Sequence, residues 1–133
     1  MILLFIFVFI AGVAKACMDT LQFHYGNSIF FCSPSNKLDN YFDASVSWRN
    51  KYKNGNPEDG PKFIGSTTIF VFLTDGWHLF QAIFLAFIFL SIVFYVPILN
   101  YPSIPLLGKL FDYFILSAVF GVAFNLFYDK ILK

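Results

Sequence analysis

The chain has 133 residues, of which 58% are hydrophobic and 13% are charged. Soluble domains average about 25% charged residues, and a chain of this length cannot bury so much apolar surface in a core of its own. Nine basic and eight acidic residues leave a formal net charge of +1, which excludes the strongly basic surface of a nucleic-acid-binding protein. The composition therefore predicts a membrane protein whose partners include membrane lipids and no nucleic acid.

The first apolar block covers residues 2–14 and ends at Lys15. Two interpretations fit it. Ala14-Lys15-Ala16 has the small-x-small form of a signal-peptide cleavage site, and the block has the length of a signal-peptide core. No Lys or Arg precedes the block, however, and this favours a retained transmembrane helix over residues 1–18, in which the long Lys15 side chain extends to the interface.

Residues 19–62 form a polar region that contains most of the charges. Its many aromatic residues argue against disorder, and residues 54–61 are a dense cluster of turn-forming residues. We expect an ordered loop with only one or two short pieces of regular structure. Cys17 and Cys32 show no disulfide or metal-ligand pattern and are predicted to be unpaired.

Residues 63–128 are predicted to form an interfacial segment followed by a transmembrane helical hairpin, with residues 129–133 as a tail. Ser66 or Thr67 is expected to cap a helix that runs from residue 67 to residue 96 with a bend at residues 74–76; a β-strand over residues 69–73 is the alternative. Residues 77–96 suffice to cross about 30 Å of hydrocarbon. A three-proline turn precedes the third span, residues 106–128.

The sequence thus predicts an all-α polytopic membrane protein with two or three transmembrane helices and an ordered polar loop. With three spans, the basic residues of the loop and of the C-terminus lie on the same side of the membrane. Lys109 lies towards the opposite side. The loop and the C-terminus are therefore expected in the cytoplasm, where thiols stay reduced. Lys109 is also expected to pair with Asp112. The predicted membrane-interface residues are Lys15, Trp77, Lys109 and Tyr128.

The strongest candidate site lies at the start of the second span, where ionisable residues are costly and therefore suggest a function. Asp75 and His78, together with Asp19 and His24 at the same membrane face, predict a metal site with two histidines and two carboxylates, suited to zinc or iron. His24 and His78 are alternatively the axial ligands of a haem. The structural interpretation is that Asp75 caps the helix and His78 is a polar anchor beside Trp77. No complete catalytic motif is present, so no reaction is predicted.

The two later spans each carry a predicted packing face, because small and polar residues let membrane helices approach and bond. In the second span, Ala82 and Ala86 share a narrow arc with Asp75 and His78. We expect the two faces to contact each other, a larger membrane protein, or a second copy of the chain. In the third span, such residues recur at every fourth position: Lys109, Tyr113, Ser117, Gly121, Asn125 and Asp129.

Four segments, MDTLQFHY (18–25), VSWRNKYKNG (46–55), GSTT (65–68) and FLTDGWHLF (72–80), resemble those of a group of small bacterial integral membrane proteins of unassigned function. The resemblance covers nearly the whole chain and supplies no activity; it implies only that the loop and the start of the second span matter together. The expected location is the bacterial inner membrane, with a multi-pass topology. We expect a binding component or accessory subunit of a membrane assembly. The alternative is a metal- or haem-dependent membrane enzyme or redox protein that uses His24, Asp75 and His78.

Overall fold

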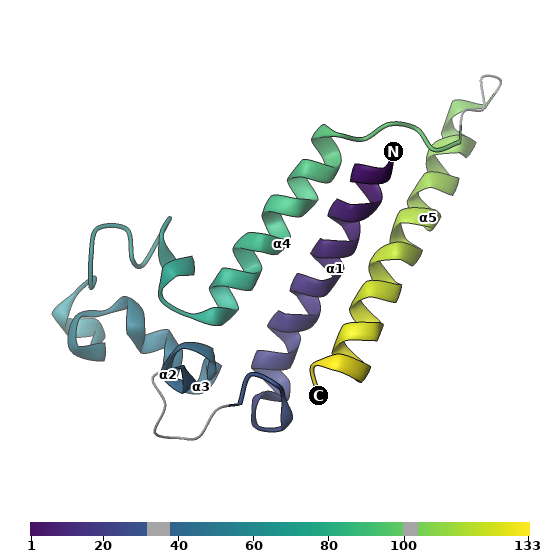
Figure 1. Cartoon of the computed structure of the whole chain (residues 1–133). Helices are drawn as coiled ribbons and strands as arrows, with labels where there is room; N and C mark the ends of the chain where they lie inside the picture. The colour runs from purple at the N-terminus through teal and green to yellow at the C-terminus, as the bar shows by residue number, and fades with distance from the viewer. Residues whose placement is uncertain (32–37, 100–103) are drawn as a thin grey trace.

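The computed structural model describes residues 1–31, 38–99 and 104–133, and it is all-helical, with no β-strand in those ranges. Three long helices run side by side: α1 (Ile2–Phe23), α4 (Gly76–Val93) and α5 (Pro105–Leu126) (Figure 1). Each is long and apolar enough to cross a membrane. The prediction of an all-α polytopic membrane protein is confirmed, with three candidate spans. Cys32 lies outside the described residues.

Helix α1 is the central helix of the three. It lies between α4 and α5 and packs against both (Figure 1). In its most apolar stretch 44% of the residues are buried, against 6% for α4 and 11% for α5. The helix continues through Lys15, which pairs with Asp19 one turn later, and ends at Phe23, beyond the predicted end at residue 18. Both other spans therefore pack against this helix.

A close contact between small residues joins α1 to α5. A Cβ atom on Gly12 would lie 2.6 Å from the backbone oxygen of Phe120 and 2.9 Å from the Cβ atom of Ala123. Ala123 is fully buried. Because Gly12 has no side chain, the two backbones approach more closely here than larger residues would allow.

The packing face predicted for the third span lies elsewhere on α5. Ser117 and Asn125 are exposed, and a Cβ atom on Gly121 would meet nothing within 4 Å. On α4, Ala82 is half-buried and Ala86 is exposed. The expected contact of these two faces within the chain is therefore wrong, because α5 turns its Ala123 face towards α1 instead.

Asp112, which is only 1% exposed, binds the segment that follows α4 to α5. Its carboxylate accepts hydrogen bonds from the Tyr95 hydroxyl at 2.7 Å and from the backbone N–H groups of Ile98 and Leu99 at 3.0 Å each. Lys109 is exposed, and no ion pair joins it to Asp112 in the described part of the chain. The predicted pair is wrong because three neutral donors already surround the carboxylate.

The polar loop lies at one end of the bundle, beside the start of α4 and near the end of α1, at the same end as the C-terminus (Figure 1). It contains two short helices, α2 (Asp39–Phe42) and α3 (Ala44–Ser47), and several 3-10 turns. The ring of Phe30 packs on Phe42 of α2 and on Phe80 of α4. The Ile29 N–H donates to the Leu132 carbonyl oxygen at 3.0 Å, beyond the wide-turn segment Phe127–Ile131 that extends α5. These contacts hold the loop against the helix ends.

The segment before α4 forms neither the helix expected from residue 67 nor the alternative strand. It consists of turns and one 3-10 helix, Val71–Leu73. Gly65 has a φ of +81°, a conformation that ends regular structure in an L-amino-acid chain. The buried Ser66 hydroxyl donates to the Lys51 carbonyl oxygen at 2.7 Å, so it ties two parts of the loop together and caps no helix.

Candidate functional site

Asp75 starts α4 and is almost completely buried, with 2% exposure. It lies in extended backbone just before the helix, and its Oδ1 atom accepts the backbone N–H of His78 at 2.9 Å. The same carboxylate bonds the His78 ring, with Oδ2 at 2.7 Å from Nδ1. An aspartate in this position satisfies a free N–H of the first helical turn. The structure thus shows Asp75 as the cap of α4, in agreement with the structural interpretation of this motif.

The start of α4 is also where the loop is anchored. The side-chain amide of Asn50 donates to the carbonyl oxygens of Asn40 at 2.6 Å and of Thr74 at 3.1 Å. A Cβ atom on Gly76 would lie 2.5 Å from the ring of Phe42, so α2 comes into direct contact with the helix. Burial raises the pKa of the nearby Tyr41 hydroxyl, and the negative charge of Asp75 raises it further.

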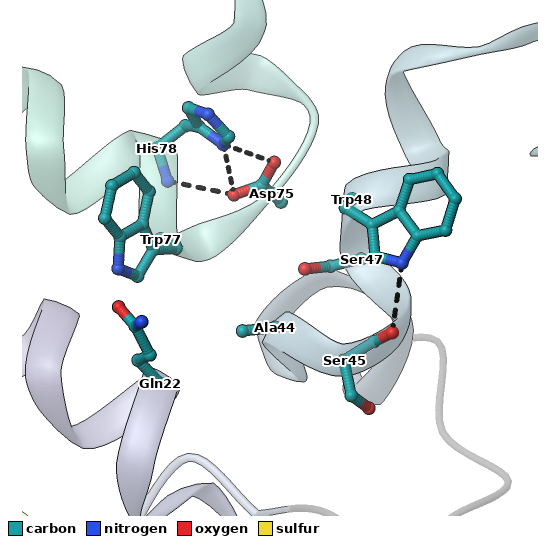
Figure 2. Close-up of a pocket in the computed structure, with 8 residues that line it drawn as sticks. All are labelled: Gln22, Ala44, Ser45, Ser47, Trp48, Asp75, Trp77 and His78. Atoms are coloured by element: carbon teal, nitrogen blue, oxygen red, sulfur yellow. Dashed lines mark hydrogen bonds and ion pairs between the residues drawn. The ribbon is translucent and has the colours of Figure 1, made fainter. Parts of the chain in front are cut away.

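A pocket of about 430 Å³ opens between these elements (Figure 2). Gln22 contributes from the end of α1, and Asp75, Trp77 and His78 contribute from the start of α4. The loop supplies the remaining residues, from α3 and the turn after it: Ala44, Ser45, Ser47 and Trp48. We call this space the rim pocket, because it lies where the polar loop meets the ends of two spans.

Two hydrogen-bond donors set into the walls of the rim pocket, the Ser47 hydroxyl and the Trp77 indole, have no protein partner among the described residues. Ser47 is 2% exposed, its hydroxyl points into the pocket (Figure 2), and no group among the described residues bonds it. The indole Nε1 of Trp77 is buried and has no acceptor in the same residue ranges. The indole of Trp48, by contrast, donates to the Ser45 carbonyl oxygen at 3.1 Å. Buried donors normally find an acceptor. Among the described residues the buried side-chain groups without one are the Trp77 indole and the Thr20 hydroxyl, and of these only Trp77 lines the pocket.

The four residues of the predicted metal site do not come together. Asp19 pairs with Lys15, and the His24 ring packs edge-on against Tyr128 at 5.5 Å, whereas His78 turns to Asp75. Nowhere in the described residues do three or more His, Cys, Asp or Glu side chains form a metal-binding group. The predicted metal site and the His24–His78 haem pair are therefore not assembled. The two histidines share an end of the bundle but contact different neighbours.

The predicted interface residues occupy both ends of the bundle. Lys15, Trp77 and Tyr128 lie towards the loop end, and Lys109 is exposed near the start of α5. Tyr128 stacks on Phe124 with 5.2 Å between ring centroids, and the Lys133 ammonium lies 3.6 Å above its ring centroid. This placement suits a tyrosine at a boundary between lipid and water.

Sequence reasoning identified the α4 half of the rim pocket and missed the loop half. Ser47 and Trp48 belong to a segment that mixes aromatic and basic residues, but no periodicity marks them as neighbours of Asp75. Only the docking of α3 against α4 brings them there.

No protein-family model matches this chain, and neither the curated proteins nor the solved structures include a detectable match.

Proposed function

We propose that this protein is a binding component or accessory subunit of a membrane assembly in the bacterial inner membrane. The supporting observation is a line of polar and small residues on α5 and the wide-turn segment that follows it, which we call the outer ridge. Its members follow each other at every fourth position and none is buried: Lys109, Tyr113, Ser117, Gly121, Asn125 and Asp129.

The outer ridge is unsuited to lipid along its middle. A serine hydroxyl or an asparagine amide gains no hydrogen bond from hydrocarbon, whereas a neighbouring transmembrane helix offers polar partners. The open space at Gly121 allows such a helix to approach closely. The opposite side of α5, with Ala123, is already occupied by α1. The outer ridge is thus the side of α5 on which a helix of another chain would pack.

We propose a cytoplasmic location for the loop and the C-terminus. The described basic residues of the loop and the C-terminus are Arg49, Lys51, Lys53, Lys62, Lys130 and Lys133, whereas Lys109 lies near the opposite end of the bundle. Such an excess of Lys and Arg beside short connections marks the cytoplasmic side of bacterial membrane proteins. A metal- or haem-dependent enzyme is not proposed, because His24 and His78 contact different partners.

A photo-crosslinking amino acid placed at Ser117 or Asn125 tests the proposed contact in cells at native expression level. We expect each to give a discrete adduct with a protein, because a packed helix lies within reach of both side chains. An adduct of about twice the mass of this chain would identify a second copy, and any other mass a different subunit. Mass spectrometry of the purified adduct reads out the partner.

Leu126 is the matched control, since it is also on α5 and is 45% exposed but lies about 100° around the helix from Asn125 and opposite Ser117. A crosslinker there should give no discrete protein adduct. The proposal would be contradicted if Ser117 and Asn125 gave no protein adduct, or if Leu126 gave the same adducts as they do.

A further inference from the structure

We infer that the rim pocket binds a flat, uncharged, membrane-soluble ring with two carbonyl oxygens, the chemistry of a quinone head group. The inference concerns binding only, and it is independent of the outer ridge because it depends on different residues.

The two free donors define what the ligand must offer. An indole N–H can only donate, so the buried Nε1 of Trp77 requires an acceptor atom. The hydroxyl of Ser47 also lacks a partner in the described part of the chain. The two groups come from different elements, α4 and the end of α3, and line the same space (Figure 2). A ligand with two separate acceptor oxygens satisfies both groups at once.

The charges at the pocket favour an uncharged ligand. The Asp75 carboxylate forms part of the wall and would repel an anion. Both of its oxygens already accept hydrogen bonds, Oδ1 from the His78 backbone and Oδ2 from the His78 ring. A cationic head group would therefore have to share these oxygens with His78. A carbonyl oxygen accepts hydrogen bonds without carrying a charge. It therefore avoids the repulsion that an anion would meet at Asp75, and it does not need the carboxylate oxygens that a cation would need.

The walls and the position of the pocket favour a flat apolar ring. Trp48 and Trp77 line it together with Ala44, and indoles offer flat surfaces on which another ring stacks. The Trp77 ring is held by an edge-on contact with His78, with 5.1 Å between centroids. The volume of about 430 Å³ lies within the usual range of about 300–1,000 Å³ for small-molecule sites. At the ends of the spans, the pocket is within reach of a solute that partitions into the bilayer.

Decylubiquinone binding to the full chain in phosphatidylcholine nanodiscs tests the inference, with isothermal titration calorimetry as the readout and empty nanodiscs subtracted. We expect saturable binding at one site per chain. Trp48 and Trp77 are the only tryptophans of the protein, so tryptophan fluorescence should be quenched with the same saturation curve as the heat.

Two variants each remove one donor. Ser47→Ala and Trp77→Phe are expected to weaken binding by about threefold to tenfold, the equivalent of one lost hydrogen bond. Trp77→Phe keeps an aromatic ring, and it removes a donor that is unpaired without ligand. The thermal unfolding midpoint of its ligand-free form should therefore be unchanged or raised. Ser91→Ala is the matched control, since the Ser91 hydroxyl on α4 already donates to the Ile88 carbonyl oxygen at 2.7 Å, and its affinity should equal that of the wild type.

Several results would overturn the inference. One is the absence of saturable heat above the empty nanodiscs. Another is equal affinity of the wild type, Ser47→Ala and Trp77→Phe, provided that far-UV circular dichroism shows all three to be folded. A third is competition by dioleoylglycerol or by the anionic lipid phosphatidylglycerol at concentrations equal to the quinone, which would identify the occupant as a lipid head group.

Discussion

Gly12→Ala is expected to lower the thermal unfolding midpoint of the detergent-solubilised protein by about 5 °C or more, because overpacking a tight contact costs about 1–3 kcal/mol. The added Cβ atom would lie 2.6 Å from the backbone oxygen of Phe120 and 2.9 Å from Ala123 Cβ. A backbone oxygen cannot rotate away as a side chain can. Helix α5 must therefore move away from α1, which loosens the contact that joins the third span to the central helix.

The same substitution at Gly121 is the control. Both glycines lie in transmembrane helices, but a Cβ atom on Gly121 meets nothing within 4 Å. Alanine is the better helix former by about 1 kcal/mol, so in the monomeric protein, free of any partner on the outer ridge, Gly121→Ala should leave the midpoint unchanged or raise it. If both substitutions lowered the unfolding midpoint equally, Gly12 would not mark a tight contact between α1 and α5. The central position of α1 in the bundle would then lose its main support.

Asp75→Ala is expected to release the start of α4 and the loop that is anchored there. The substitution removes the cap on the His78 N–H and the bonds to the His78 ring, at a combined cost of about 2–3 kcal/mol. Hydrogen–deuterium exchange measured by mass spectrometry in nanodiscs should become about tenfold to a hundredfold faster for the amides of residues 76–80.

Asp75→Asn separates the two contributions of this carboxylate. Asparagine caps helices about as well as aspartate, so the first turn should remain largely protected, and only the charged bond to the imidazole is lost. If the Asn variant exchanged as fast as the Ala variant, the bond to the ring and not the cap would hold the helix start. Wild-type exchange in both variants would contradict the anchoring role altogether.

The three spans were predictable because bilayer thickness imposes a length on apolar helices, and that length is a local property of the sequence. Predicted and observed bounds therefore agree closely for the second and third spans, residues 77–96 against Gly76–Val93 and residues 106–128 against Pro105–Leu126. The contact between Asp75 and His78 was also predictable from local sequence, because the two residues are only three positions apart. The expected helix before α4 failed because Ser66 bonds Lys51, a partner fifteen positions away in the chain.

The order of the helices and the composition of the rim pocket were not predictable from the sequence. Every fourth residue of the third span is small or polar, and this pattern defines a face without saying what the face contacts. Gly12 and Ala123 decide the packing, and their fit depends on the shapes of two distant segments. In the same way, Ser47 reaches the pocket only because α3 docks beside the start of α4.

The membrane topology tests the central claim, three spans with the loop and the C-terminus on one side. Single cysteines at Ile2, Lys53 and Lys133, in a chain whose Cys17 and Cys32 are replaced by serine, can be labelled with a membrane-impermeant maleimide in spheroplasts and in inverted vesicles. The structure and the proposed orientation predict that Ile2→Cys reacts only in spheroplasts, and that Lys53→Cys and Lys133→Cys react only in inverted vesicles. Reaction of Ile2→Cys and Lys133→Cys from the same side would contradict the account, because it requires an even number of spans.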